Sequence, residues 1–240
     1  AYFIYKNLRK KNGRLLKSFR NESADITPHF DDYAYMIFGL LNLYESTFKV
    51  FYLSWSFDLA NIMEMDFFDE KGGFFIGSKD SEKLMIRAKN GYDSAMPSGN
   101  SVAITNFFRL GKISGDTRWK VLSRKSLASF SEQAKNTPTG FANMHTGFIT
   151  HNNNSKVLVV VAKSYDNRIQ KIIQEIKSQY SPNVLTIFKD ISDPDKLNHI
   201  APWLSSYTCL QEKPTFYLCE DFACKQPTTN IKTILNLLQY

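Results

Sequence analysis

The architecture is predicted chiefly from one apolar stretch near the start of the chain, Tyr33-Ala34-Tyr35-Met36-Ile37-Phe38-Gly39-Leu40-Leu41. As a helix, this stretch is apolar around nearly its whole circumference, so we expect other elements to enclose it on all sides. Asp31 or Asp32 can provide its N-cap. The helix that follows is amphipathic, as is typical of a surface helix, with apolar side chains on one face at Tyr52, Trp55, Leu59 and Met63.

The same alternation recurs further along the chain. Residues 102–113 form a second helix that is largely apolar all round, which Ser98 or Asn100 can start and Gly115 ends. Its partner is again amphipathic, with apolar side chains at Trp119, Leu122, Leu127, Phe130 and Ala134. Enclosed helices that alternate with surface helices form the two concentric rings of an α/α toroid. We therefore predict that residues 1–150 form an arc of such a toroid, because a complete toroid needs more helices than this length holds.

The periodicity changes after the polar run His151-Asn152-Asn153-Asn154-Ser155, where we place a domain boundary. Residues 157–161 are a continuous apolar run, typical of a strand that is buried on both faces. A helical pattern and a second strand at residues 184–188 follow, which predicts a right-handed βαβ unit with parallel strands. Residues 215–219 supply a third strand, and an amphipathic helix ends the chain. We expect residues 156–240 to form a small parallel α/β domain, so that the fold class is mainly α with an α/β tail.

The net charge of +7 comes from one segment of the chain. Residues 1–21 contain seven basic residues and no acidic one, and the rest of the chain carries equal numbers of both. Because the excess is not spread over a face of the fold, a nucleic-acid partner is not expected. No apolar stretch is long enough to span a membrane, and no signal peptide is visible. Together with only three cysteines, this predicts a cytoplasmic protein without a membrane partner.

Small and polar residues gather directly before the second apolar helix, in Gly91-Tyr92-Asp93-Ser94-Ala95-Met96-Pro97-Ser98-Gly99-Asn100-Ser101. In a toroid, the loops that enter the inner helices line the central cavity, so these side chains would face it. Asp93 can act as an acid or a base, and Ser98 and Asn100 can hydrogen-bond a hydroxylated ligand. The same residue types also suit a helix N-cap with a tight turn, and that structural interpretation stays open.

The residues before the first apolar helix, His29-Phe30-Asp31-Asp32-Tyr33, stand in the same relation to the cavity. One carboxylate suffices for the N-cap, which leaves the other for a ligand. Asp31 or Asp32 can pair with Asp93 as the acid and base of a sugar hydrolase, whose two carboxylates lie about 5–10 Å apart. We take Asp32 and Asp93 as the catalytic candidates. The predicted ligand-binding residues are His29, Asp31, Tyr33, Ser98 and Asn100.

No metal site and no cofactor are expected from the sequence. The four histidines lack the spacing of metal ligands, and no glycine-rich phosphate loop follows the first strand. Cys219 and Cys224 have four residues between them, which differs from the Cys-x-x-Cys spacing of redox enzymes. The pair can form a disulfide across a short loop or remain as two thiols, and both cysteines are redox candidates.

Four blocks of the sequence occur together in one recognisable order: Asp31–Glu45, Phe68–Phe75, Asp93–Ala103 and Tyr217–Pro227. With them the chain resembles the C-terminal part of the bacterial YyaL and spermatogenesis-associated protein 20 family. The resemblance implies a longer protein with an N-terminal thioredoxin-like domain, followed by a six-hairpin toroid similar to that of glycosidases and N-acylglucosamine 2-epimerases. This chain would hold the last part of the toroid and the terminal α/β module. Ser94 stands where the family usually has glycine.

Three functions are consistent with these features. The first is binding or processing of a carbohydrate in the toroid cavity, as in a glycoside hydrolase or a sugar epimerase. The second is a non-catalytic scaffold whose partners are the N-terminal thioredoxin-like domain and the remaining part of the toroid. The third is a redox role for the pair Cys219 and Cys224.

Overall fold

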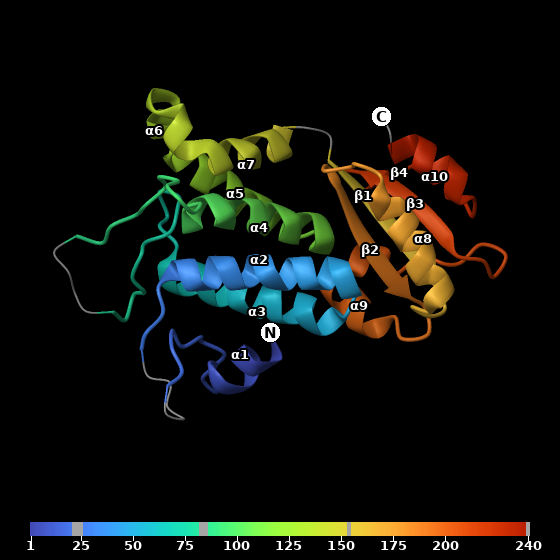
Figure 1. Cartoon of the computed structure of the whole chain (residues 1–240), viewed down its shortest axis with the longest axis horizontal. Helices are drawn as coiled ribbons and strands as arrows, with labels where there is room; N and C mark the ends of the chain where they lie inside the picture. The colour runs from blue at the N-terminus through green and yellow to red at the C-terminus, as the bar shows by residue number, and fades with distance from the viewer. Residues whose placement is uncertain (21–25, 82–85, 153–154, 239–240) are drawn as a thin grey trace. The chain divides into compact units, whose positions relative to one another are not determined.

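The computed structural model describes residues 1–20, 26–81, 86–152 and 155–238. The chain divides into two compact units (Figure 1). Unit 1 holds residues 1–110 and 117–149, and unit 2 holds residues 111–116 and 150–240. Within the described ranges, no helix is both long enough and apolar enough to cross a membrane.

Unit 1 is helical, and its longest helices form an antiparallel hairpin. The elements in chain order are α1 (Tyr2–Asn7), α2 (Phe30–Thr47), α3 (Val50–Phe67), α4 (Gly99–Ser114), α5 (Thr117–Ser129), α6 (Ser131–Asn136), the 3-10 helix η1 (Pro138–Phe141) and α7 (Ala142–Asn152). The last turn of α4 and the end of α7 belong to unit 2. Phe48, in the left-handed conformation with φ 53°, makes the short turn between α2 and α3 possible. Residues 153–154 of the predicted polar boundary lie outside the described residues.

The two helices that were predicted to be enclosed differ in burial. α4 is buried around nearly all of its circumference, as expected. α2 has an open face along Asp31, Tyr35, Phe38 and Asn42, and the Phe38 side chain is 42% exposed. The prediction that α2 is covered on all sides is therefore wrong, because the described part of unit 1 leaves this face to solvent.

The start of α2 also differs from its predicted N-cap. The helix begins at Phe30 with His29 as N-cap, so Asp31 and Asp32 lie inside its first turn. Asp32 is the third residue of the helix, and its Oδ2 accepts a hydrogen bond of 2.8 Å from the backbone N–H of His29. This is the reciprocal half of a capping box, in which an acidic side chain satisfies the N-cap backbone from within the first turn.

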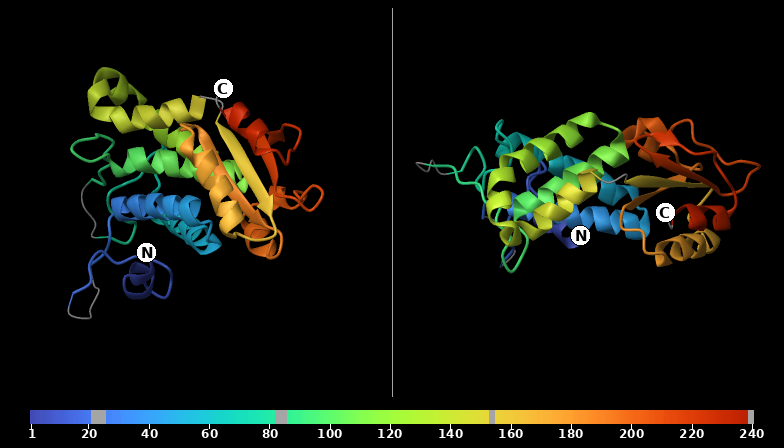
Figure 2. Two further views of the ribbon diagram at one scale, coloured as in Figure 1. Left: turned by 45° about the vertical axis from the view of Figure 1, so that its right-hand side comes forward. Right: turned by 90° about the horizontal axis from the view of Figure 1, so that it is seen from above.

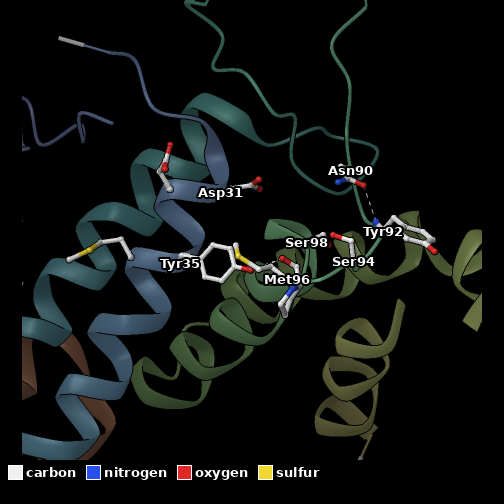
Figure 3. A pocket seen from close by; sticks show the side chains of 10 residues that line it. Asp31, Tyr35, Asn90, Tyr92, Ser94, Met96 and Ser98 are labelled. Atoms are coloured by element: carbon white, nitrogen blue, oxygen red, sulfur yellow. Dashed lines mark hydrogen bonds between the residues drawn. The ribbon is translucent and has the colours of Figure 1, made fainter. Parts of the chain in front are cut away.

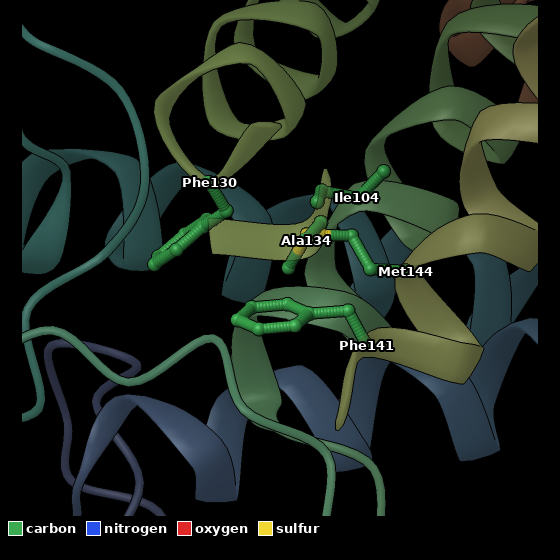
Figure 4. Close-up of a cluster of buried hydrophobic side chains, with 5 residues drawn as sticks. All are labelled: Ile104, Phe130, Ala134, Phe141 and Met144. Carbon is green, nitrogen blue, oxygen red and sulfur yellow. The ribbon is translucent and has the colours of Figure 1, made fainter. Parts of the chain in front are cut away.

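The predicted partner of α4 is split into two helices. α5 ends at Ser129 and α6 begins at Ser131, with Phe130 between them outside helical geometry. The expected apolar face is nevertheless buried, because Phe130 and Ala134 pack together with side chains of α4, η1 and α7. This cluster consists of Ile104, Phe130, Ala134, Phe141 and Met144, with Leu127 at its margin (Figure 4).

Unit 2 is a four-stranded sheet with helices. Its elements are β1 (Lys156–Ala162), α8 (Asn167–Ser178), β2 (Val184–Asp190), α9 (Asp195–Ile200), the 3-10 helix η2 (Pro202–Leu204), β3 (Thr215–Glu220), β4 (Ala223–Cys224) and α10 (Ile231–Leu238). The strand order is β2-β1-β3-β4, with β1 parallel to β2 as predicted. The coarse fold class, mainly α with an α/β tail, is therefore confirmed.

The sheet is mixed, however, so the prediction of a parallel α/β domain is wrong. β3 runs antiparallel to β1, with Thr215 opposite Val161, and β4 runs antiparallel to β3. Asp190, the last residue of β2, lies opposite Ala162 at that same end of β1. The connection from β2 to β3 thus begins and ends at the same end of β1. β3 therefore runs antiparallel to β1 and β2.

In unit 2 a βαβ unit is thus followed by the helix α9, the hairpin of β3 and β4, and the final helix α10. α8 and α10 lie side by side on one face of the sheet (Figures 1 and 2). A fold alone does not assign a function. Thioredoxins carry a Cys-x-x-Cys motif next to the βαβ unit. Here the chain has Tyr165-Asp166-Asn167-Arg168 at the start of α8, and Asp166 caps the helix.

Candidate functional site

A pocket of about 570 Å³ opens in unit 1 where the starts of α2 and α4 meet the loop that precedes α4. Figure 3 shows Asp31 and Tyr35 on successive turns of α2, with Ser94, Met96 and Ser98 on the facing loop. The lining side chains are Asp31, Asp32, Tyr35, Met36, Asn90, Tyr92, Ser94, Met96, Pro97 and Ser98.

The starts of α2 and α4 approach closely because residue 99 is glycine. The Asp31 carboxylate lies against Gly99, whose backbone N–H favours the charged form of the carboxylate. A Cβ atom at residue 99 would overlap this carboxylate and would lie 2.7 Å from Cζ of Phe30. The small residue at the start of α4 therefore allows a carboxylate on one helix to reach the backbone of the other.

The carboxyl group of Asp31 releases its proton less readily than that of an ordinary aspartate. The pKa of its carboxyl is raised above the ordinary value, first by desolvation and then by the negative charge of the adjacent Asp32. His29, the Gly99 N–H and Lys17 oppose this shift. The side chain nevertheless remains exposed to solvent. A carboxyl group with these properties can both accept hydrogen bonds from a ligand and donate a proton to it.

Tyr35 links the α2 side of the pocket to the loop. Its hydroxyl donates a hydrogen bond of 2.5 Å to the carbonyl oxygen of Pro97. Burial raises the pKa of this hydroxyl, and the charges of Asp31 and Asp93 add to the effect. The hydroxyl therefore keeps its proton at neutral pH, and the ring stays fixed at the pocket wall.

The rim of the pocket offers exposed aromatic and apolar surface. The Tyr92 side chain is 53% exposed and that of Met96 is 63% exposed. The Tyr92 ring packs edge-on against Phe141 at 5.9 Å between centroids, so its position is supported from behind. The backbone N–H of Tyr92 donates to Oδ1 of Asn90, which orders this side of the rim.

Asp93 lies outside the pocket lining and bonds to the backbone of two helices. Its Oδ1 accepts the N–H of Ser98 at 2.8 Å, and its Oδ2 accepts the N–H groups of Asn143 at 2.9 Å and Met144 at 3.3 Å. A carboxylate at two helix N-termini is stabilised by the free N–H groups and by both helix dipoles. In this structure Asp93 joins the starts of α4 and α7 and holds the pocket loop in place.

Asn100 also stabilises the pocket loop, through hydrogen bonds from its buried side chain to the backbone. Its side chain is fully buried, and its Oδ1 accepts the N–H of Phe74 at 2.8 Å. Its Nδ2 donates to the carbonyl oxygens of Phe74 at 3.1 Å and Asn90 at 2.8 Å. Ser98, which does line the pocket, also caps α4 by accepting the N–H of Ser101 at 3.2 Å.

The other two predicted ligand residues lie elsewhere. Tyr33 is 1% exposed, and its hydroxyl accepts the N–H of Leu15 at 3.0 Å within the core. His29 is the exposed N-cap of α2 and is outside the lining. Of the predicted site residues, the structure thus brings Asp31, Asp32 and Ser98 together in the pocket.

Sequence reasoning missed several lining residues. Tyr35 and Met36 follow Asp31 and Asp32 by four positions, and this helical spacing places them on the same face. That spacing could have identified them. The others on the loop, Tyr92, Ser94, Met96 and Pro97, belong to the segment that was singled out, but their residue types carry no distinctive chemistry.

Two electrostatic features limit what the pocket can hold. Among the lining residues that the structure describes, Asp31 and Asp32 are charged and none is Lys or Arg. In the same described ranges, no three His, Cys, Asp or Glu side chains are grouped as metal ligands would be. The lining favours a neutral or cationic ligand over an anionic one.

Comparisons with known proteins show what the chain is similar to. It is 30% identical over 237 residues to human spermatogenesis-associated protein 20, and the match covers 95% of this chain. The predicted resemblance to the spermatogenesis-associated protein 20 family is confirmed. The rat and mouse forms of spermatogenesis-associated protein 20 are each 29% identical over 210 residues, or 87% of this chain.

A more distant relative is the uncharacterized protein B0495.5 of Caenorhabditis elegans, at 25% identity over 217 residues and 90% of this chain. The chain spans 30% of the length of human spermatogenesis-associated protein 20 and 27% of the rat and mouse proteins. No protein-family model matches the chain.

Proposed function

We propose that the pocket of unit 1 binds a carbohydrate. The observation that carries this proposal is the lining itself, in which carboxylates, hydroxyls and an amide stand beside exposed aromatic rings around one hollow. Sugars present hydroxyl groups at their edges and C–H groups on their faces, so they need hydrogen-bonding groups and apolar surface together. Asp31, Ser94 and Ser98 supply the first, and Tyr35 and Tyr92 supply the second.

The size and charge of the pocket support the same ligand class. A hollow of about 570 Å³ falls in the usual range for small-molecule sites, about 300–1,000 Å³. Phosphates and other anions would meet Asp31 and Asp32 with no compensating cation in the described lining. A neutral ligand rich in hydroxyl groups can instead donate hydrogen bonds to both carboxylates.

Asp31 is the residue that we propose for acid chemistry on a bound sugar. Its raised pKa makes it a better proton donor near neutral pH than an ordinary aspartate. Asp93, the second catalytic candidate from the sequence, has both carboxylate oxygens bonded to backbone N–H groups. We therefore propose ligand binding for this chain. A catalytic partner for Asp31 would come from the part of the longer relatives that this chain does not match.

We also propose that residues 1–150 form an arc of an α/α toroid of the six-hairpin glycosidase type, followed by the α/β domain of residues 156–240. Support comes from the helix pairs α2/α3 and α4/α5, and from the starts of α2 and α4 at one pocket. In that arrangement, the helices of the longer relatives would complete the wall around the sugar.

The test is titration of the protein with a panel of monosaccharides and disaccharides, followed by NMR chemical shifts and calorimetry. Binding should move the signals of Tyr35, Tyr92 and Ser98. Asp31→Asn should weaken binding at least tenfold, because one carboxylate interaction is lost. Asp58→Asn is the matched control, since Asp58 is exposed on α3 and burial raises its pKa as well. Unchanged signals with every sugar in the panel would exclude the proposal.

A second candidate function is packing against the part of the relatives that this chain does not match. The observation that favours it is the open face of α2, where Phe38 is 42% exposed, together with Tyr2 and Phe3 at 72% and 57%. Hydrogen exchange on a longer form of the protein is the test. Protection of α2 around Phe38, relative to this chain, would support packing, and equal exchange would argue against it.

A further inference from the structure

Unit 2 contains a disulfide between neighbouring strands. Cys219 of β3 and Cys224 of β4 are directly opposite each other in the antiparallel ladder and are joined by the disulfide. Cys219 is 1% exposed, whereas Cys224 is exposed. A reductant from solvent can therefore reach the sulfur of Cys224 but not that of Cys219.

A tyrosine hydroxyl lies against both sulfurs. The Tyr207 hydroxyl is 2.7 Å from Sγ of Cys224 and 3.6 Å from Sγ of Cys219. Burial raises the pKa of this hydroxyl, with a smaller contribution from Tyr217, so it stays protonated at neutral pH. It is thus a hydrogen-bond donor placed where negative charge would develop on a sulfur during thiol–disulfide exchange.

The surrounding residues hold Tyr207 in this position. Its ring stacks on Tyr217 at 4.5 Å and meets Trp203 edge-on at 5.5 Å. The buried amine of Lys189 donates to the carbonyl oxygen of Tyr207 at 2.9 Å and to that of Leu204 at 2.5 Å. A lysine that is 3% exposed and bonded to backbone carbonyls fixes the path of this segment.

The turn between the two cysteines has an unusual backbone conformation. Asp221 and Phe222 both have positive φ, at 45° and 68°, although neither is glycine. Such conformations persist only where surrounding contacts impose them. The Asp221 carboxylate pairs with Lys112 at 2.8 Å, and the Phe222 ring packs against Trp203 at 5.2 Å. β4 has only two residues, and the disulfide adds a covalent attachment to its backbone pairing with β3.

We propose that Cys219–Cys224 is a redox-active disulfide that a dithiol reductant opens reversibly in the folded protein. A reductant thiolate attacks Sγ of Cys224, and the electron pair of the S–S bond passes to Sγ of Cys219. The Tyr207 hydroxyl donates a hydrogen bond to this leaving thiolate. The second thiol of the reductant then attacks the mixed disulfide and releases Cys224, which leaves an oxidised reductant. Protons from the two reductant thiols balance the two new protein thiols.

Opening the disulfide would release the turn and its two contacts. Without the cross-link, Asp221 and Phe222 can leave their positive-φ conformations, which breaks the contacts to Lys112 and Trp203. Trp203 then becomes a reporter, because Trp55 and Trp119 are buried in unit 1. The disulfide would in this way couple the thiol redox state to the local structure of the hairpin.

The experiment is timed alkylation during reduction by dithiothreitol, with intact mass and Trp fluorescence as readouts. A Cys209→Ser background removes the free thiol. We expect two alkyl groups to be added while circular dichroism stays native, and oxidised glutathione to reverse the reaction. Tyr207→Phe should slow reduction about fivefold, the effect of one hydrogen bond. Tyr180→Phe, at a side chain 92% exposed, is the matched control and should leave the rate unchanged.

Two outcomes would overturn the proposal. Reduction only after addition of denaturant would make the disulfide a purely structural cross-link. Two thiols that remain reduced in oxidised glutathione would show that the bond does not form under physiological conditions. An unchanged rate in Tyr207→Phe, together with reversible reduction, would overturn the role of the tyrosine alone.

Discussion

The Asp31 carboxylate, in the first turn of α2, lies against Gly99, the first residue of α4. The two residues are far apart in the sequence, and Asp31 lines the unit 1 pocket together with Ser98, the residue before Gly99. Gly99 is needed for close approach, and Asp31 supplies a carboxyl group that also faces solvent. One contact therefore serves both the packing of two helices and the chemistry of the pocket.

Gly99→Ala tests the close approach. The new methyl group would overlap the Asp31 carboxylate and the Phe30 ring, so we expect a loss of about 1–3 kcal/mol in the free energy of unfolding. Urea denaturation measures it. Gly39→Ala is the control, because nothing lies within 4 Å of its added Cβ. Alanine is the better helix former, so this variant should gain up to about 1 kcal/mol. Equal effects of the two substitutions would contradict the steric argument.

Asp31→Asn tests how the raised carboxyl pKa affects the pH dependence of stability. The raised carboxyl pKa means that the folded state binds the proton more tightly than the unfolded state. Stability of the native protein should therefore fall as pH rises from the ordinary value of 3.8 through the raised value. Asparagine removes this titration but keeps an acceptor for Gly99. The variant should be as stable as the native protein at low pH and more stable by at most about 1 kcal/mol at pH 7, since the side chain is exposed.

Denaturation of both proteins at several pH values provides the check. The difference in unfolding free energy between variant and native protein should grow with pH and then level off. A variant that is less stable at pH 7 would show that the charged carboxylate stabilises the contact with Gly99, contrary to the direction of the pKa shift.

Local patterns predicted the elements of unit 2 but not their full arrangement. The apolar run at residues 157–161 and the spacing of Ile169, Ile173 and Ile176 identify β1 and α8 because burial acts on neighbouring positions. The direction of β3 depends on where the connection from β2 returns to the sheet, which is set by tertiary packing. No periodicity within Thr215–Glu220 encodes that direction.

The same limit applies to the pocket. Asp31 and Ser98 were identifiable because polar residues at helix starts follow a local pattern. The role of Asp93 was not, since two of its three hydrogen-bond partners, Asn143 and Met144, come from α7 about fifty residues later. A carboxylate that binds backbone N–H groups looks the same in sequence as one that faces a ligand.

Asp93→Ala tests the structural role of that carboxylate. Three backbone N–H groups at the starts of α4 and α7 would lose their acceptor, which should lower the free energy of unfolding by about 2–4 kcal/mol. Thermal and urea unfolding measure this change. Asp195→Ala is the control, because Asp195 is exposed in the first turn of α9. A loss below about 0.5 kcal/mol in Asp93→Ala would mean that water replaces the carboxylate at both helix starts.

Asp69 provides a pH-dependent test of the turn between Phe68 and Phe74, which pair as an antiparallel bridge. Lys89 donates a hydrogen bond of 2.8 Å to its Oδ2 and lowers the pKa of the carboxyl below the ordinary value of 3.8. The stabilisation is therefore fully present above that value and is lost as pH falls through the lowered pKa. Asp69→Asn should cost about 1–2 kcal/mol at pH 7 and progressively less below about pH 4.

The matched control for this variant is Asp193→Asn. Asp193 forms an ion pair with Lys196 at 2.6 Å, but its side chain is 53% exposed and that of the lysine is 70% exposed. A solvent-exposed pair contributes about 0–1 kcal/mol, so this substitution should change stability little at any pH. Asp69 and Lys89 are 18% and 24% exposed, and their lower exposure is the reason for the larger expected effect. If both variants lose the same stability at pH 7, burial does not strengthen the Asp69–Lys89 pair.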